Sequence, residues 1–207
     1  MVWSSVRPID GSDEEWPVVG YDGCPSLPGM TLTRAVVGDE VTWAVESPVP
    51  ARYHGQPGET YRFLLFRRWD RTKPLVGWVL LNPSSASATE PDPTFRRVIA
   101  FSKKWGFGGA QVVNAYALRN KDPRIVLAHA GRSGGIENDM HIARVARKAD
   151  AVVLAWGTNV EAAREGQLFG ILRKHRPALF CLGRSQHGYP LHPLYQPADR
   201  EPHPWQY

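Results

Sequence analysis

Two asparagines that each follow an apolar run are the side chains best suited to chemistry in this sequence. Asn82 comes directly after residues 77–81, and Asn114 comes directly after residues 110–113. A carboxamide offers both a donor and an acceptor, as is needed to read the edge of a nucleobase or to position a water molecule. Pro83 disfavours a helical backbone at Asn82 and would therefore hold its carboxamide in place. The alternative is that asparagine simply tolerates strand ends and caps helices.

His192 is the histidine that we single out, because an imidazole can donate a hydrogen bond to a leaving base or developing anion at neutral pH. Pro190 and Pro193 would stiffen its loop. The alternative is a surface histidine in a proline-rich tail. His187 lies nearby, but two histidines without a clear third ligand make a poor metal site, so we expect no metal. The glycine-rich residues 106–109 precede an apolar run instead of following one, so no cofactor is expected either.

Among the carboxylates, Asp139 is the best candidate for a free acid near such a site, and Asp92 is the second. Asp139 belongs to the acidic segment 137–139, whose alternative role is to cap a helix and complement its positive end. Asp92 precedes Pro93 and is better explained as a helix cap. Ser84 also follows an apolar run, but the flanking glycines of a nucleophile elbow are missing, so we place it among base-binding residues and not as a nucleophile.

The elements expected to position these residues alternate between strands and helices from residue 77 onward. Strands are predicted at 77–81, 110–113, 151–156 and 178–182. Helices are predicted from Asp92-Pro93 to about 105, briefly after Asp122-Pro123, over 136–148, and from Thr158 or Asn159 to about Lys174. This alternation is typical of parallel strands joined by right-handed helical crossovers.

The runs before residue 77 favour antiparallel pairing. Residues 32–37 and 41–45 flank a short turn, which predicts a hairpin, and residues 61–69 form another β-prone run. The sequence therefore predicts an α/β fold with three α/β/α layers, a mostly parallel central sheet and an N-terminal antiparallel edge. In such a sheet the loops after successive strands meet at one rim, where ligands bind. Asn82, Asn114, Tyr116 and His192 would share that rim.

Composition and length favour one domain spanning 32–207, preceded by an irregular arm over 1–31. The 207 residues include no apolar run long enough to span a bilayer, and the first residues do not resemble a signal peptide, so we expect a cytoplasmic protein without a membrane partner. We expect a monomer. The formal net charge of +5 weakly favours a polyanion such as DNA or a nucleotide as partner. The nucleic-acid-binding candidates are Arg67, Arg68, Arg96, Arg97 and Arg119, with a solvated basic face as the alternative.

The stretch from Tyr61 to Tyr195 contains the strings LNPSSA, DPTFRR, WGFGG, VVNAYALR, DP, IENDM, AWG and HPLY. With these strings, nearly the whole stretch resembles an uncharacterised bacterial and phage family, domain-of-unknown-function family 1643. This resemblance by itself implies little about activity.

The order of motifs is also similar to that of the uracil-DNA glycosylase superfamily. The matching motifs are Asn82-Pro83 after a strand, the later aromatic Phe95, a strand ending in Asn114, Trp156-Gly157, and a final His192-Pro193-Leu194-Tyr195. The resemblance implies that Phe95 stacks on a flipped base, that Asn114 reads the base edge, and that His192 supports the departing base. It further implies that Leu194 and Tyr195 wedge into the duplex. Phe95 also falls in a predicted helix, where it would be core.

These observations lead to one functional hypothesis and two alternatives. The leading hypothesis is a base glycosylase-like enzyme that cleaves or recognises an N-glycosidic bond of an ordinary or modified base in DNA or a nucleotide. The base-binding set is Asn114, Phe95, Tyr116, Pro83, Ser84 and Gly157, and the catalytic set is Asn82, His192 and Asp139. With asparagine in place of aspartate at residue 82, activation of water would be weak. The alternatives are a nucleotide-processing hydrolase or transferase and a non-catalytic nucleic-acid-binding module.

Overall fold

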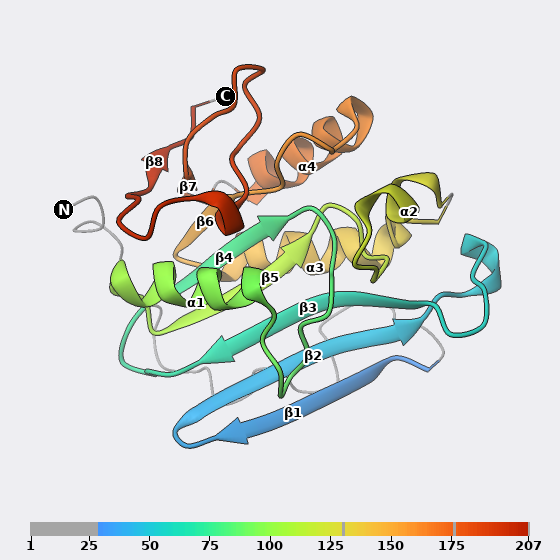
Figure 1. The fold of residues 1–207 in the computed structure, drawn as a ribbon, viewed down its shortest axis with the longest axis horizontal. Helices are drawn as coiled ribbons and strands as arrows, with labels where there is room; N and C mark the ends of the chain where they lie inside the picture. The colour runs from blue at the N-terminus through green and yellow to red at the C-terminus, as the bar shows by residue number, and fades with distance from the viewer. Residues whose placement is uncertain (1–28, 130, 176, 207) are drawn as a thin grey trace.

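A computed structural model describes residues 29–129, 131–175 and 177–206, and these form one eight-stranded mixed sheet with four α-helices (Figure 1). The strand order is β1-β2-β3-β5-β4-β6-β7-β8. The chain is therefore an α/β protein, as predicted. The predicted arm lies outside the described residues over 1–28, and Thr31 already belongs to the first strand.

The first three strands form the antiparallel part of the sheet. Strands β1 (Thr31–Val37) and β2 (Glu40–Pro48) make the predicted hairpin, with Gly38 at a positive φ of 59° in the turn. After a short 3-10 turn, η2 (Ala51–Tyr53), strand β3 (Thr60–Arg68) pairs with β2 on one side and with β5 on the other. Strand β3 is thus an internal strand of the sheet.

Four later strands run parallel to one another at the centre. They are β4 (Leu75–Leu80), β5 (Gly109–Asn114), β6 (Ala151–Leu154) and β7 (Leu179–Cys181), and they correspond to the four runs predicted from residue 77 onward. All four strands are buried on both faces, which explains why their residues are almost all apolar, with Gln111 of β5 as a buried polar exception. A two-residue strand, β8 (His203–Pro204), pairs antiparallel with β7.

The prediction of a mostly parallel sheet is wrong. Among the described strands, four neighbouring pairs are antiparallel and three are parallel. The difference arises because β1, β2 and β3 are as long as or longer than the central strands and join them directly through the β3–β5 pair. The tail adds a further antiparallel pair at the opposite edge.

The helices begin close to the predicted caps, with one exception. Helix α1 (Pro93–Lys104) is capped by Asp92, whose Oδ1 accepts from the backbone N–H of Phe95 at 2.8 Å. Helix α2 (Pro123–Ala128) is capped in the same way by Asp122. Helix α3 spans Gly135–Lys148. Helix α4 (Ala162–His175) begins three residues after Asn159, later than either predicted cap.

Alternate residues of β4 pack into two separate hydrophobic clusters. Trp78 belongs to the cluster that contains Phe101 of α1, whereas Val79 belongs to the cluster that contains Val145 of α3 and Leu168 of α4. Because successive side chains of a strand point to opposite faces, α1 and the pair α3 and α4 cover opposite faces of the sheet (Figure 1). Over the described ranges, no helix is both long and apolar enough to cross a membrane.

Candidate functional site

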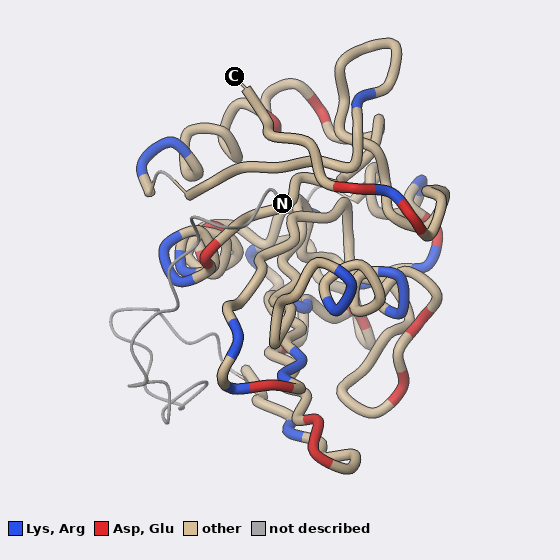
Figure 2. Tube along the Cα trace, turned by 90° about the vertical axis from the view of Figure 1, so that its left-hand side faces the viewer, with Lys and Arg blue, Asp and Glu red and all other residues tan. Residues whose placement is uncertain are grey.

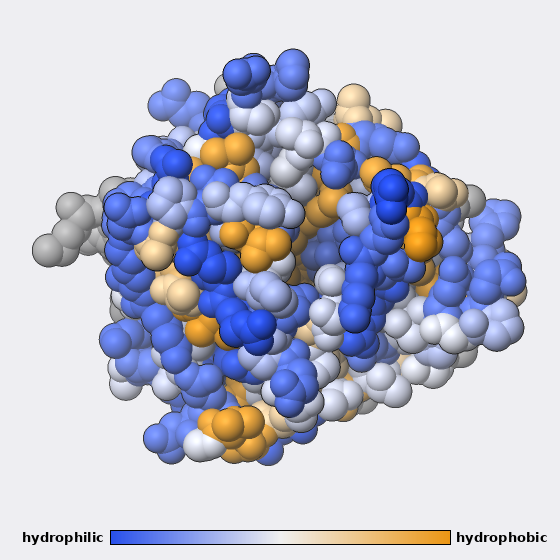
Figure 3. All heavy atoms as spheres, in the orientation of Figure 1, coloured by the Kyte–Doolittle hydropathy of each residue, from blue (hydrophilic) through white to orange (hydrophobic). Residues whose placement is uncertain are grey.

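A cavity of about 490 Å³ opens beside α1, where β4, β5 and β6 end. Figure 3 shows the hollow near the middle of this face of the molecule. Asn82, Asn114 and His192 all line it, although they come from three loops or strand ends far apart in the sequence. The other predicted catalytic, base-binding and wedge residues in its wall are Ser84, Phe95, Gly157, Leu194 and Tyr195, and Asp92, the second candidate acid, lines it as well. The parallel run of β4, β5 and β6 brings their carboxyl ends together and so creates this convergence.

Asn82 is held by its amide nitrogen. Its Nδ2 donates to the backbone carbonyl of Pro83 at 2.9 Å and to that of Asn120 at 2.8 Å. Both amide protons are therefore used inside the protein, and the orientation of the carboxamide is set. Its oxygen, Oδ1, makes no hydrogen bond with the described residues and is available as an acceptor.

Asn114 is the last residue of β5 and is almost fully buried, with 2% of its surface exposed. Within the part of the chain that the structure describes, its Oδ1 has no hydrogen-bond partner. Asn138 of α3 donates from Nδ2 to the backbone carbonyl of Asn114 at 3.0 Å, which anchors the strand end. A buried acceptor without a partner costs stability, so its presence in a cavity wall indicates a donor supplied by a bound molecule or by water.

His192 is positioned by the short 3-10 turn that it caps, η3 (Pro193–Tyr195). The backbone N–H of Leu194 donates to His192 Nδ1 at 3.3 Å, so in the neutral ring the proton is on Nε2. Burial lowers the pKa of His192, and the carboxylate of Asp92 opposes this shift. The ring is therefore neutral at pH 7 and presents Nε2–H as a donor.

Trp156 and Gly157 hold the loop that carries His192. Gly157 donates its N–H to the carbonyl of Pro190 at 2.9 Å and has a positive φ of 76°. Trp156 is buried and donates from Nε1 to Glu165 of α4 at 3.3 Å. Both residues line the cavity, and their hydrogen bonds tie the end of β6 to its neighbours.

The aromatic and apolar residues of the cavity differ in exposure. Phe95 is buried, and the guanidinium of Arg67 lies 5.3 Å from its ring centroid. It contributes to the core and to the cavity wall at the same time, and its stacking on a base stays a prediction. Leu194 and Tyr195 are exposed, with 36% and 79% of their surfaces accessible.

Three of the predicted catalytic and base-binding residues do not line the cavity. Asp139 is not a free carboxylate, because its Oδ1 pairs with Arg164 of α4 at 2.7 Å. Tyr116 is buried, and its hydroxyl accepts from the backbone N–H of Glu161 at 3.0 Å. Pro83 acts through its backbone carbonyl, which accepts from Asn82. We therefore do not retain Asp139 as a candidate acid.

Most of the predicted nucleic-acid-binding arginines are engaged within the protein. Arg67 donates to Thr42, and Arg68 donates to the carbonyl of Arg71. Arg97 donates to the carbonyl of Gln196, next to η3. Arg96, which is exposed, donates to the carbonyl of Pro91 at 2.6 Å. Figure 2 shows acidic residues interspersed with basic ones along the described chain. These side chains do not form a uniform basic face.

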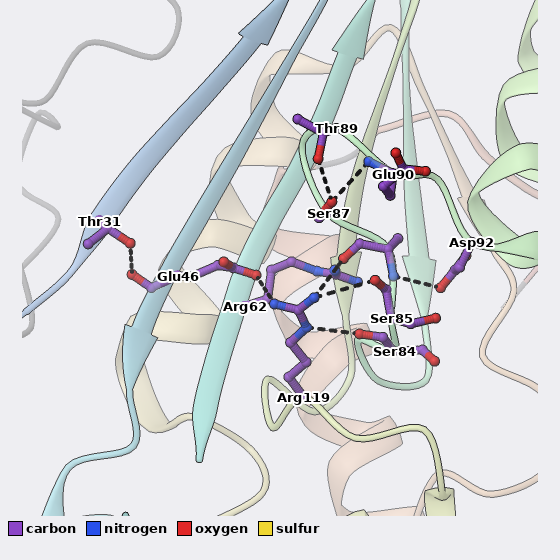
Figure 4. A network of polar contacts seen from close by, with 11 residues as sticks. Thr31, Glu46, Arg62, Ser84, Ser85, Ser87, Thr89, Glu90, Asp92 and Arg119 are labelled. Atoms are coloured by element: carbon purple, nitrogen blue, oxygen red, sulfur yellow. Dashed lines mark hydrogen bonds and ion pairs between the residues drawn. The ribbon is translucent and has the colours of Figure 1, made fainter. Parts of the chain in front are cut away.

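Arg119 and Arg62 brace the loop between β4 and α1. Arg119 pairs with Glu46 at 3.0 Å and donates to the carbonyls of Ser84, Ser85 and Ala86 (Figure 4). Arg62 donates from Nη1 to the same carbonyl of Ala86. Arg119 was predicted to contact DNA, but its contacts here give it a structural role, which is to hold this loop.

The family described as "Protein of unknown function (DUF1643)" matches residues 62–194, more than half of the chain. The chain belongs to this family. The DUF1643 match begins at Arg62 and ends at Leu194, and both residues line the cavity. Strands β1, β2 and β8 lie outside it. No curated protein and no solved structure is significantly similar to the chain.

Arg62 is the most deeply buried of the charged residues that line the cavity of this DUF1643 protein, and the sequence analysis did not predict it. It is 4% exposed, yet it lines the cavity. Burial, with a smaller contribution from the charge of Arg119, lowers the pKa of Arg62 to about 10, so it remains a cation at pH 7. The sequence feature that could have indicated Arg62 is its single charge within residues 61–66, which are otherwise apolar. Asn120 and Lys121 also line the cavity and were not singled out.

Proposed function

We propose that the cavity binds a nucleobase and that the protein is a glycosylase-like enzyme acting on the N-glycosidic bond of that base. The observation that carries this proposal is the shared cavity of Asn82, Asn114 and His192. The proposal includes a distant relationship to the uracil-DNA glycosylase superfamily, because a residue from each of the five similar motifs lines the same cavity, namely Asn82, Phe95, Asn114, Gly157 and His192.

The buried carboxamide of Asn114 supports recognition of a base edge. Its unpartnered Oδ1 would accept from a ring N–H or an exocyclic amino group. The cavity wall around it includes Leu65, Leu80 and Val112, which suit the flat, weakly polar faces of a base ring. Phe95 supplies an aromatic surface in the same wall. A base that satisfied Asn114 would be preferred over one that left it unpaired.

The positions of Asn82 and His192 suit the two ends of a glycosidic bond. When the bond from C1′ to the base nitrogen breaks, the electron pair goes to the base, and the oxygen of a water molecule bonds to C1′. Asn82 Oδ1 would accept from that water and orient it, since a carboxamide does not take up a proton at neutral pH. His192 Nε2–H would donate to the departing base and stabilise its developing negative charge. The water loses one proton as it becomes the hydroxyl group on C1′, and that one proton neutralises the base anion.

A nucleotide-processing hydrolase or transferase is the second candidate. Arg67, Arg97 and Arg119 already bind other groups of the protein. They are therefore less available to bind the backbone of a long nucleic acid, which favours a small nucleotide as substrate. Lys121 is exposed at the cavity and makes no polar contact with the residues that the structure describes, so it would suit one terminal phosphate. The non-catalytic module has the least support, since it depends mainly on those arginines.

The test is to incubate the purified protein with oligonucleotides that carry uracil or modified pyrimidines, and in parallel with the matching free nucleotides. Abasic sites, detected by alkaline strand cleavage, would support the glycosylase on DNA. Release of free base only from nucleotides would support the second candidate. Absence of base release from every substrate, with binding also absent, would overturn both.

Variants separate a true reaction from a contaminant. Asn114→Ala and His192→Ala should each lower base release by roughly 10- to 1000-fold, because they remove base recognition and stabilisation of the leaving group. Lys148→Ala is the control, because Lys148 is an exposed basic residue at the end of α3 and does not line the cavity. Salt-dependent DNA binding that survives Asn82→Ala and His192→Ala, without any base release, would instead identify a binding module.

A further inference from the structure

Arg62 and Asn114 come from neighbouring strands and line the same cavity. Strand β3 runs antiparallel to β5, so the start of β3 lies beside the end of β5, where Asn114 is located. Both side chains are more than nine-tenths buried. The wall therefore combines a guanidinium, which only donates, with a carboxamide oxygen, which only accepts.

Within the described residues Arg62 forms no ion pair with a carboxylate, although the charges of Glu46 and Asp92 act against the lowering of its pKa by burial. The one hydrogen bond of its side chain within the described residues runs from Nη1 to the carbonyl of Ala86, and its Nε has none. Glu46, the acid that belongs to the same network, is already paired with Arg119 at 3.0 Å. Asp92 accepts from the backbone N–H groups of Ala86 and Phe95 instead.

A buried cation of this kind is costly unless a partner neutralises it. Loop bracing does not explain the charge, because a neutral donor would satisfy the carbonyl of Ala86 equally well. Arg119 already binds that carbonyl as well. The guanidinium is a planar donor group that matches carboxylate and phosphate oxygens, so the missing partner is best supplied from the cavity.

We infer that Arg62 is a specificity-determining residue that selects ligands bearing an oxyanion. The inference rests on the proposed function only in taking the ligand to contain a nucleobase. The oxyanion has two chemical sources, an acidic substituent on the base ring or the phosphate of a nucleotide. In both cases its negative charge would lie against Arg62, while a ring N–H or amino group lies against Asn114.

Calorimetric titration with matched ligand pairs tests the inference and distinguishes the sources. One pair is a uracil carboxylate and the corresponding uracil carboxamide, with the substituent at ring position 5 or 6, and the other is uridine monophosphate and uridine. The charged member of one pair should bind roughly 10- to 100-fold more tightly than its neutral partner. The pair that shows the preference identifies the source. Equal affinities within both pairs, or no binding by any of the ligands, would overturn the inference.

Variants show whether the preference comes from Arg62. In Arg62→Met the preference should fall to about one, whereas Arg62→Lys should keep part of it because it retains the charge. Arg119→Met is the matched control, since Arg119 braces the same loop but does not line the cavity. It should keep the full preference even if all ligands bind more weakly. If Arg119→Met removes the preference as completely as Arg62→Met, the selective role of Arg62 is wrong.

This experiment is independent of catalysis. A protein that releases bases but does not distinguish charged from neutral ligands retains the proposed function and loses this inference. A protein that prefers the charged ligands in an Arg62-dependent way, without any base release, retains the inference and loses the glycosylase assignment.

Discussion

Asn138 donates a hydrogen bond from its Nδ2 to the backbone carbonyl of Asn114, 3.0 Å away. Both residues are buried, and the bond ties the start of α3 to the end of β5. Replacing Asn138 with alanine leaves a buried carbonyl without this donor and creates a small void. We expect Asn138→Ala to lower the free energy of unfolding by about 1 to 3 kcal/mol, measured by urea denaturation. The exposed Asn159→Ala should change it by less than about 0.5 kcal/mol, and equal losses in both variants would contradict this role.

Buried His141 predicts a pH dependence of stability. Burial, with a smaller contribution from Arg144, lowers the pKa of His141 to about 4. The unfolded chain, in which histidine titrates near its usual 6.5, therefore binds more protons than the folded protein between these values. Stability should then be constant above about pH 6.5 and fall as the pH decreases toward 4, with a loss of about 2 kcal/mol between pH 7 and pH 5.

The variant His141→Phe isolates this contribution. A phenylalanine would preserve the stacking on Phe63, whose ring centroid is 5.2 Å from that of His141. Urea denaturation of both proteins at pH 7 and pH 5 should show a smaller loss in the variant by about 2 kcal/mol. His192 and His175, whose pKa values are also lowered, are present in both proteins and cancel in the comparison. Parallel pH profiles would show that His141 is not responsible.

Gly157 and Gly170 should respond in opposite ways to alanine. Gly157 has a φ of 76°, where a Cβ is strained, so Gly157→Ala should cost about 1 to 2 kcal/mol and loosen its bond to Pro190. Gly170 is exposed inside α4 and a Cβ there would meet nothing within 4 Å, so Gly170→Ala should stabilise by about 0.5 to 1 kcal/mol. Thermal unfolding checks both. A destabilised Gly170 variant would contradict the described course of α4.

The parallel centre of the fold was predictable because each of its strands is buried on both faces and so reads as a short apolar run. The caps at Asp92 and Asp122 were predictable because aspartate followed by proline is a local signal. The spatial strand order was not, since nothing local states which strands become neighbours. Strand β8 has only two residues and forms through tertiary contacts, such as the bond from the backbone N–H of Trp205 to the carbonyl of Leu179.

The grouping of Asn82, Asn114 and His192 followed from one rule, that parallel strands share an edge at their carboxyl ends. Asp139 shows the limit of that rule. Asp139 lies in the first turn and a half of α3, which comes after β5 in the sequence. Its position around the helix axis directs its carboxylate toward Arg164 and not into the cavity. Arg62 was missed for a different reason. In a strand taken as part of an antiparallel edge a charged side chain is ordinary, whereas β3 is internal and its arginine faces a cavity.

The contacts of Asn82 explain why this position holds an amide and not an acid. Its Nδ2 lies between two carbonyl oxygens, those of Pro83 and Asn120, at 2.9 and 2.8 Å. A carboxylate there would place negative charge against two acceptors and lose both hydrogen bonds. We therefore expect Asn82→Asp to lower the free energy of unfolding by at least about 2 kcal/mol at pH 7, and the loss should shrink at low pH as the new carboxyl becomes protonated.

The same variant separates two interpretations of the site's chemistry. If residue 82 needed only a stronger base, Asn82→Asp would raise base release, because a carboxylate activates water better than an amide. We expect base release to fall instead, since the loop from Asn82 to α1 loses its anchor. Asn82→Ala removes both bonds without the repulsion and should be more stable than Asn82→Asp in urea denaturation. A stable and more active Asn82→Asp would contradict this anchoring role of the amide nitrogen and would show that the cavity tolerates a general base at this position.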